Sequence, residues 1–241
     1  MNPRFRATAT AVLLSAGLVA ASDAPTRPQA ALGRLKAGND RFASNASAPV
    51  ALSVNRRQEV ADAQQPAAMV LSCADSQVPP EHVFNAGLGE LLVVRTAGGV
   101  IDRSVLATLE YGADRLHVPL LVVMGHEACD VVRAAADHPG DHESTNLDFV
   151  MKAIQASRHQ GTSAGERSEI RALVLANVEQ VINDALSKSP MLRKMVDAGQ
   201  LQVVGAYYEA VSGRVIFSEP VAHAAVPQGT VSAVARDPGR H

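Results

Sequence analysis

Two stretches of the chain decide the fold, Met69-Val-Leu-Ser-Cys-Ala-Asp-Ser-Gln77 and Val122-Val-Met-Gly-His-Glu-Ala-Cys129. Each starts as a short apolar run typical of a buried strand and stops abruptly at side chains that bind soft or borderline metal ions. Two thiolates, an imidazole and a carboxylate suit tetrahedral Zn²⁺. Adjacent strand ends would bring these groups to one point, so the two stretches predict a zinc site. Its expected ligands are Cys73, Asp75, His126 and Cys129.

A disulfide is the simplest alternative for the same residues. Cys73 and Cys129 are the only two cysteines of the chain, and an exported protein could pair them. A disulfide, however, does not need Asp75 and His126 beside the cysteines. Alone, a histidine here is typical of a buried core position and an aspartate of a turn, so it is the joint placement at two strand ends that favours a metal.

Further apolar runs extend the same pattern along the chain. Short, continuous apolar runs are typical of strands that are buried on both faces of a parallel sheet. A glycine turn, Ala97-Gly-Gly-Val100, follows the second of them. Two more runs flank Val211-Ser-Gly213, which is a hairpin signal. The predicted strands are residues 67–72, 91–95, 118–124, 201–208 and 214–217.

Helical patterns lie between these strands. Asp102 or Ser104 can cap a helix, and Ser189-Pro190 supplies a cap followed by a first-turn proline. The order of elements predicts an α/β fold with a mainly parallel central sheet flanked by helices and a C-terminal hairpin. Gly125 is expected to let the chain bend before His126. The first predicted helix starts near Pro28 and carries Leu35 and Phe42. The other predicted helices cover residues 56–63, 102–113 and 146–159, a long segment around 170–182, and Ser189 to Gly199.

The two ends of the chain predict its domain organisation. Residues 1–21 combine basic Arg4 and Arg6, an apolar run of about fourteen residues, and small residues for cleavage, which is typical of an export signal. A membrane-anchoring or buried helix is the alternative. We expect export to the bacterial periplasm without a stable membrane anchor, a single domain over residues 22–220, and a loose tail over 221–241.

Composition narrows the functional classes. The chain has 22 Lys plus Arg against 24 Asp plus Glu, with no basic run or aromatic stripe, so no nucleic-acid partner is expected. Aromatic residues make up 3% and Trp is absent, so the core must be aliphatic. The histidines other than His126 lack ligand-like spacing and are interpreted as solvated or structural. They are His82, His117, His138, His142, His159, His223 and His241.

The motifs together resemble those of beta-class carbonic anhydrases. Cys-x-Asp-Ser is followed by Val-Pro-Pro-Glu, Val-Val-Arg-x-Ala-Gly and Gly-His-x-x-Cys, and the likeness extends over residues 30–219. The resemblance implies zinc-dependent, reversible hydration of CO2 to bicarbonate and a proton. It also implies a substrate pocket with Ala97, Gly98 and Gly99 in its wall, and a homodimer or dimer of dimers. Such pairing would run through the sheet edge, with N-terminal helices over the neighbour. In a single chain we expect Leu35 and Phe42 of the first helix to be poorly covered.

Two positions depart from the pattern of the family. The resemblance places arginine where this chain has Gln77, and glycine where it has Asp130. That arginine is expected to grip Asp75 and hold it off the metal, whereas Gln77 offers one uncharged hydrogen bond. Asp75 and Gln77 are therefore the candidate catalytic pair. Arg95 or Arg103 could replace the missing charge, although for Arg95 we expect an ion pair at the strand end.

Gln77 leaves two other functions open. If Asp75 stays on the zinc, the site is closed, and the protein holds or stores metal without catalysis. If the site is open, it could instead hydrolyse another small linear molecule, such as a sulfur analogue of CO2. The glycine turn and the Val-Pro-Pro segment favour a working pocket, and the sequence leaves these functions unresolved.

Overall fold

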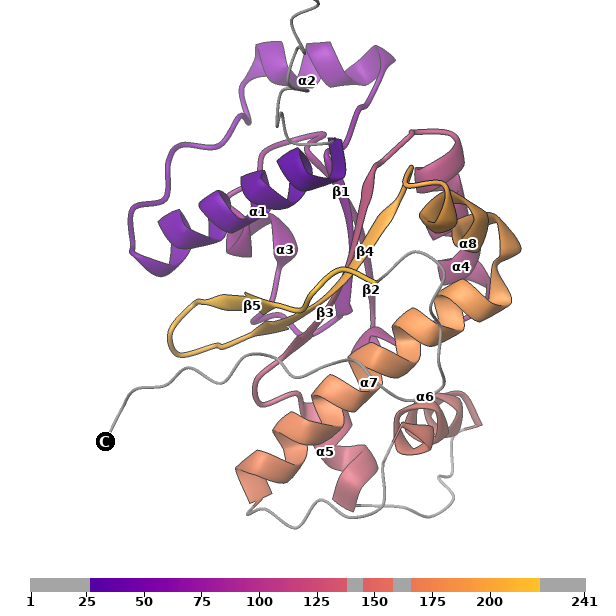
Figure 1. Cartoon of the computed structure of the whole chain (residues 1–241). Coiled ribbons are helices and arrows are strands. Elements are labelled where there is room, and N and C mark those ends of the chain that lie inside the picture. The colour runs from indigo at the N-terminus through magenta and orange to yellow at the C-terminus, as the bar shows by residue number, and fades with distance from the viewer. Residues whose placement is uncertain (1–26, 138–144, 158–165, 222–241) are drawn as a thin grey trace, which may run out of the picture.

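One sheet organises the described part of the protein. The computed structural model describes residues 27–137, 145–157 and 166–221 (Figure 1). The sheet has five strands in the order β2-β1-β3-β4-β5; β5 pairs antiparallel with β4, and the other pairs are parallel. The predicted fold class is confirmed. The strands are β1 Ala68–Cys73, β2 Leu91–Thr96, β3 Leu120–His126, β4 Gln202–Tyr208 and β5 Val215–Phe217.

Helices cover both faces of this sheet (Figure 1). Helices α1, α3, α5 and α6 pack on one face around Val70 and Val122, and α4 and α8 pack on the other around Leu71 and Leu121. The long α7 contributes to both apolar clusters. The helices are α1 Arg27–Ala43, α2 Val54–Asp62, α3 Pro80–Val83, α4 Arg103–Asp114, α5 Asp130–Asp137, α6 Thr145–Ala156, α7 Glu166–Lys188 and α8 Pro190–Asp197.

Side-chain caps fix where several helices begin. Asp102 accepts a hydrogen bond from the backbone N–H of Val105 at 2.8 Å, and Ser189 accepts one from Leu192 at 3.2 Å. Each bond satisfies an amide that the first helical turn leaves without a partner. The predicted caps at Asp102 and Ser189 are confirmed. The short helices α3 and α5 were not separately predicted, because four to eight residues carry too little periodicity.

Strand β2 corrects one expectation. Residues 91–95 were expected to be buried on both faces, but every residue of β2 is only partly buried. The reason is its position, because β2 is the edge of the sheet and pairs with β1 alone. By contrast, all six residues of β1 are buried.

Gly125 has a different role from the one expected. A Cβ at Gly125 would lie 2.4 Å from Val174 Cγ1 and 3.0 Å from Val178 Cγ2, both on α7. Glycine is therefore required so that α7 can pack directly on β3. The chain turns instead at Ala128, which adopts a φ of 55°.

The N-terminal helix α1 is better covered than expected. The dimer expectation assumed that Leu35 and Phe42 would be poorly covered in one chain, but Leu35 is only 4% exposed and Phe42 packs against the same apolar cluster. The large apolar side chains left exposed near the N-terminus are instead Leu52 at 53% and Val54 at 57%. Helix α2 buries none of its residues.

Several expectations lie outside the described residues. These are the export signal of residues 1–21, the tail of residues 221–241 except for Val221, and the histidines His138, His142, His159, His223 and His241. Among the described residues, none of the helices has the length and apolar character needed to cross a membrane.

Candidate metal centre

The four predicted ligands meet at the carboxyl-terminal edge of the sheet. Cys73 is the last residue of β1 and His126 the last of β3, and these strands are parallel neighbours. Asp75 follows Cys73 by two residues, and Cys129 immediately precedes α5. One ligand atom from each of the four residues lies within 4.8 Å of the other three.

The distances between ligand atoms fit a tetrahedral zinc ion. The two sulfur atoms, Cys73 Sγ and Cys129 Sγ, are 3.8 Å apart, and both thiols are free. Tetrahedral zinc with Zn–S bonds of about 2.3 Å separates two sulfurs by about 3.8 Å, whereas a disulfide holds them at about 2.05 Å. His126 Nε2 and Asp75 Oδ2 are 3.2 Å apart, close to the roughly 3.3 Å expected for bonds of about 2.0 Å.

Two polar atoms at this point are buried without a hydrogen-bond partner. They are His126 Nε2 and Asp75 Oδ2. The other ring nitrogen, His126 Nδ1, lies 2.9 Å from the backbone carbonyl of Glu127, which can only accept, so Nδ1 carries the proton. Nε2 is therefore left with its lone pair facing the centre, as metal-binding histidines require. A metal ion at this point satisfies both atoms.

The backbone between His126 and Cys129 turns sharply, so that both side chains can bind one metal ion. Ala128 has a φ of 55°, a left-handed conformation that non-glycine residues rarely adopt and that concentrates at functional sites. The segment is also tied to β4, because the N–H of Glu127 donates to the carbonyl of Tyr208 at 2.8 Å. The turn lets both His126 and Cys129 face the same point.

The glycine turn lies against Cys73. Ala97–Gly99 forms a single 3₁₀ turn, in which Gly98 has a φ of 67° and Gly99 a φ of 65°. The N–H of Gly98 donates to Cys73 Sγ at 3.3 Å. The predicted turn is present beside the centre, and its part in a substrate pocket remains a prediction.

The four groups compete for protons when no cation balances them. A hydrogen bond from Cys129 and the N–H of Gly98 lower the pKa of Cys73, while the same thiol pair and burial raise the pKa of Cys129. Burial and the charge of Cys73 raise the pKa of Asp75. Burial opposes the charged form of His126, but the neighbouring Cys73 and Asp75 raise its pKa overall. A divalent cation relieves this repulsion and releases protons as it binds.

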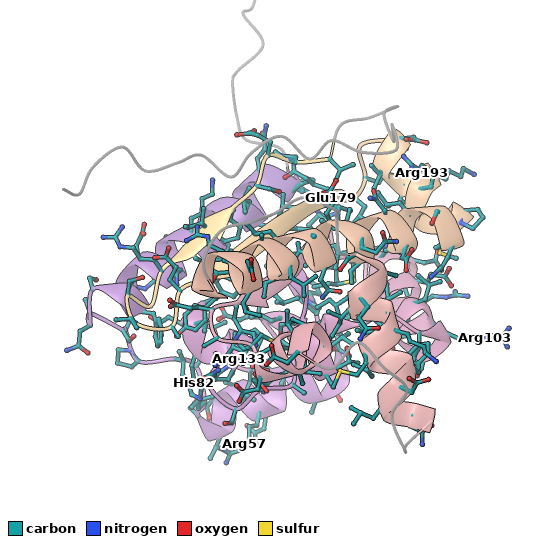
Figure 2. All side chains as sticks on the ribbon, turned by 90° about the horizontal axis from the view of Figure 1, so that it is seen from below. Arg57, His82, Arg103, Arg133, Glu179 and Arg193 are labelled. Carbon is teal, nitrogen blue, oxygen red and sulfur yellow. The ribbon has the colours of Figure 1, made fainter. Side chains whose placement is uncertain are left out.

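The residues expected to hold Asp75 off the metal do not reach its carboxylate. Gln77 is exposed, and no hydrogen bond of its side chain is seen among the described residues. Arg103 is exposed at the rim of the molecule, where Figure 2 shows it pointing outward. The carboxylate of Asp75 instead faces His126, in the position of a fourth ligand.

Arg95 contacts the ligand turn in an unexpected way. It was expected to form an ion pair, but its Nε donates to the backbone carbonyl of Cys73 at 3.0 Å and its Nη2 to the backbone carbonyl of Asp75. Arg95 therefore fixes the backbone that carries two ligands and leaves the carboxylate free.

Sequence reasoning missed the turn at Ala128, the contacts of Arg95 with backbone carbonyls, and Asn177 on α7, whose Nδ2 donates to the carbonyl of Gly98 at 2.7 Å. Asn177 had a visible signal, since an amide in the apolar stripe of a long helix needs a buried partner. Arg95 and Ala128 had none, because backbone hydrogen bonding and backbone torsion leave no pattern in residue type.

Comparisons with known proteins agree with this site. The sequence model of the family described as "Carbonic anhydrase" matches residues 68–215. "Carbonic anhydrase 2" of Mycobacterium tuberculosis is 34% identical over 81% of this chain and 95% of its own length. "Carbonic anhydrase" of Mycolicibacterium smegmatis is 35% identical over 79% of this chain and 93% of its own length. The solved structure of Coccomyxa beta-carbonic anhydrase aligns with a TM-score of 0.61 and 26% identity, over 68% of this chain and 77% of that one.

A parallel sheet that brings two cysteines, a histidine and an aspartate together at its carboxyl-terminal edge defines a zinc protein. With the matches in sequence and structure, this chain belongs to the beta-class carbonic anhydrase family.

We predict that the purified protein binds about one zinc ion per chain through these four side chains. Cys73→Ser or His126→Ala removes a ligand and should lower bound zinc severalfold or more, as measured by elemental analysis after dialysis. Ser76→Ala, at an exposed position of the same turn, should keep the zinc. Undiminished zinc in both ligand variants contradicts the assignment.

Proposed function

We propose that this protein catalyses the reversible hydration of CO2 to bicarbonate and a proton. The observation that carries this conclusion is the tetrahedral spacing of Cys73, Asp75, His126 and Cys129 in a chain of this family. Zinc, when bound, supplies the chemistry by making a water molecule acidic enough to react near neutral pH. The chain itself must hold the metal, orient the reactants and control access.

Asp75 is the ligand whose side chain has room to change conformation. Its side chain is 29% exposed and lies on a turn, whereas the His126 side chain is 0% exposed at the end of a buried strand. Cys73 and Cys129 are each 2% exposed. Only Asp75 can therefore turn away without disturbing the core, and it can then accept a hydrogen bond from a reactant. We propose that it acts as the switch between a closed and a working site.

The glycine turn supplies an apolar wall beside the centre. A Cβ on Gly98 would lie 2.8 Å from Ile154 Cδ1 and 3.3 Å from Val131 Cγ1, so α5 and α6 close around the turn. CO2 has no charge and no hydrogen to donate, so an apolar wall suits it better than it suits water. We propose that Ala97, Gly98 and Gly99 line the substrate pocket.

Gln77 weakens the working state in this proposal. A bidentate charged pair holds a carboxylate away from a metal more firmly than one neutral amide bond, by about 1 kcal/mol or more. Without the charged pair, the equilibrium between Asp75 off the metal and Asp75 on the metal shifts towards the bound form by roughly tenfold. The exposed position of Gln77 and the carboxylate facing His126 support this view.

We predict that Gln77→Arg raises the rate of CO2 hydration at pH 7 by roughly tenfold, because the added charge draws Asp75 from the ligand position. Stopped-flow measurement with a pH indicator gives the rate. Gln200→Arg is a matched control, since it adds the same charge at an exposed position just before the amino end of β4, whereas the metal centre lies at the carboxyl ends of the parallel strands. An unaltered protein that is fully active, and that Gln77→Arg does not improve, contradicts the proposed role of Gln77.

A closed, metal-holding protein is the second candidate, because the Asp75 carboxylate occupies a ligand position. The same measurement separates the two functions. A zinc-loaded protein without CO2 hydration, both unaltered and as Gln77→Arg, would favour metal holding. No observation in the site favours hydrolysis of a sulfur analogue of CO2.

We also propose that the chain forms a homodimer or a multiple of dimers. The outer edge of β2 has no partner strand within the described chain, and its six residues are only partly buried. Helix α2 has nine residues and buries none, and a helix of this length is not stable without tertiary contacts. An exposed edge strand and the exposed apolar side chains of Leu52 and Val54 at the start of α2 both call for a covering surface.

Light scattering tests this assembly. We expect a dimer or larger even assembly at micromolar concentration, and charged substitutions at the exposed apolar positions, Leu52→Glu with Val54→Glu, should weaken it at least tenfold. Val211→Glu is the control, because Val211 is 94% exposed on the distant β4–β5 turn. A monomeric unaltered protein contradicts the proposal.

Export to the periplasm rests on the sequence pattern of residues 1–21. We propose cleavage near Ser22, which follows small residues. Expression of the full chain in a Gram-negative host should yield periplasmic protein whose N-terminal sequence starts close to Ser22. Protein that keeps Met1 and stays in the cytoplasm contradicts the proposal.

A further inference from the structure

Asn177 is a buried polar residue that the zinc site does not directly use. It lies on α7, is 5% exposed, and is flanked along the helix by the buried apolar residues Val174 and Val178. An amide placed in an apolar layer costs free energy unless it forms a hydrogen bond. Its bonding partner therefore indicates what the residue is for.

That partner is the glycine turn. Asn177 Nδ2 donates to the backbone carbonyl of Gly98 at 2.7 Å, across a sequence separation of 79 residues. The N–H of the same residue, Gly98, donates to Cys73 Sγ at 3.3 Å. A chain of two hydrogen bonds therefore runs from the middle of α7 through one glycine to a metal ligand.

The conformation of Gly98 makes this arrangement possible. Its φ of 67° lies in the left-handed region, which lets its carbonyl face α7 while its N–H faces the metal centre. Within the turn, Thr96 Oγ1 donates to the carbonyl of Val100 at 2.8 Å, which closes the loop from the other side. Gly98 is thus held by two side chains, with Asn177 on its carbonyl and Cys73 on its N–H.

We propose that Asn177 is a positioning residue of the metal centre, which holds the Gly98 N–H against the Cys73 thiolate. An N–H donor stabilises the negative charge on sulfur and orients the thiolate towards the metal. Residues that support a ligand in this way typically change metal affinity by about 10–100-fold when they are lost. The inference rests on the zinc site of the proposed function.

Loss of the Asn177 amide should weaken zinc binding more than it lowers the stability of the fold. In Asn177→Leu a side chain of similar size cannot donate, so the Gly98 carbonyl loses its partner and the turn can rotate away from Cys73. Asn177→Asp keeps the shape and polarity of the side chain but, as a carboxylate, cannot donate either. Val181→Ala, one turn further along α7 and 4% exposed, is the control for general weakening of the helix packing.

Zinc release into an excess of chelator is the first measurement. We expect release to be about tenfold or more faster in Asn177→Leu and Asn177→Asp, and close to that of the unaltered protein in Val181→Ala. The second measurement uses the cobalt-substituted proteins, in which thiolate-to-cobalt charge transfer absorbs in the near ultraviolet. Loss of the N–H bond raises the energy of the sulfur electrons, so this band should move to longer wavelength only in the Asn177 variants.

The outcomes are distinct from those that test the function. Equal zinc release in all three variants, with an unchanged cobalt band, overturns the role of Asn177. If the Asn177 variants fail to fold, amide hydrogen exchange of Gly98 in the unaltered zinc protein decides, since protection no greater than that of the neighbouring turn amides also overturns it. An unaltered protein that binds no zinc overturns the proposed function itself.

Discussion

The structure depends on the convergence of four metal-binding side chains at the end of two parallel strands. Cys73 Sγ and Cys129 Sγ approach to 3.8 Å, and His126 Nε2 and Asp75 Oδ2 to 3.2 Å, in a largely buried region where acidic groups repel one another. Without a cation this arrangement is unfavourable, because unpaired buried charge is costly. With zinc, the same crowding becomes coordination. The surrounding elements hold this arrangement in place.

The packing of α7 on the sheet explains how the site stays rigid. Gly125, the residue before His126, lets α7 lie directly on β3. Asn177, on the same helix, holds the glycine turn beside Cys73 through its hydrogen bond to Gly98. Arg95 holds the backbone carbonyls of Cys73 and Asp75 from the other side. Three ligands are thereby fixed in buried positions. Asp75 is the most exposed of the four ligands, with 29% of its side chain accessible, and this exposure supports its proposed role as the switch of the site.

The parallel strands and the four ligands could be predicted from the residue types in the sequence. Apolar runs ending at Cys73 and His126 indicated both the parallel strands and the ligands, because the carboxyl ends of neighbouring parallel strands must meet. Features that depend on neighbours in space were not predictable. The half-exposure of β2 follows from strand order, the role of Gly125 from the approach of α7, and the turn at Ala128 from backbone torsion. Arg95 was misjudged because its partners are backbone carbonyls, which no sequence pattern marks.

A crystal structure of the zinc-loaded protein at pH 7 tests the central claim most directly. The account predicts one zinc ion in a tetrahedron of Cys73, His126 and Cys129, with Asp75 Oδ2 as the fourth ligand at about 2.0 Å. The Cys73 sulfur should also accept the hydrogen bond of Gly98. A disulfide between Cys73 and Cys129, or a zinc ion whose fourth ligand is water while Asp75 is turned away, would contradict it.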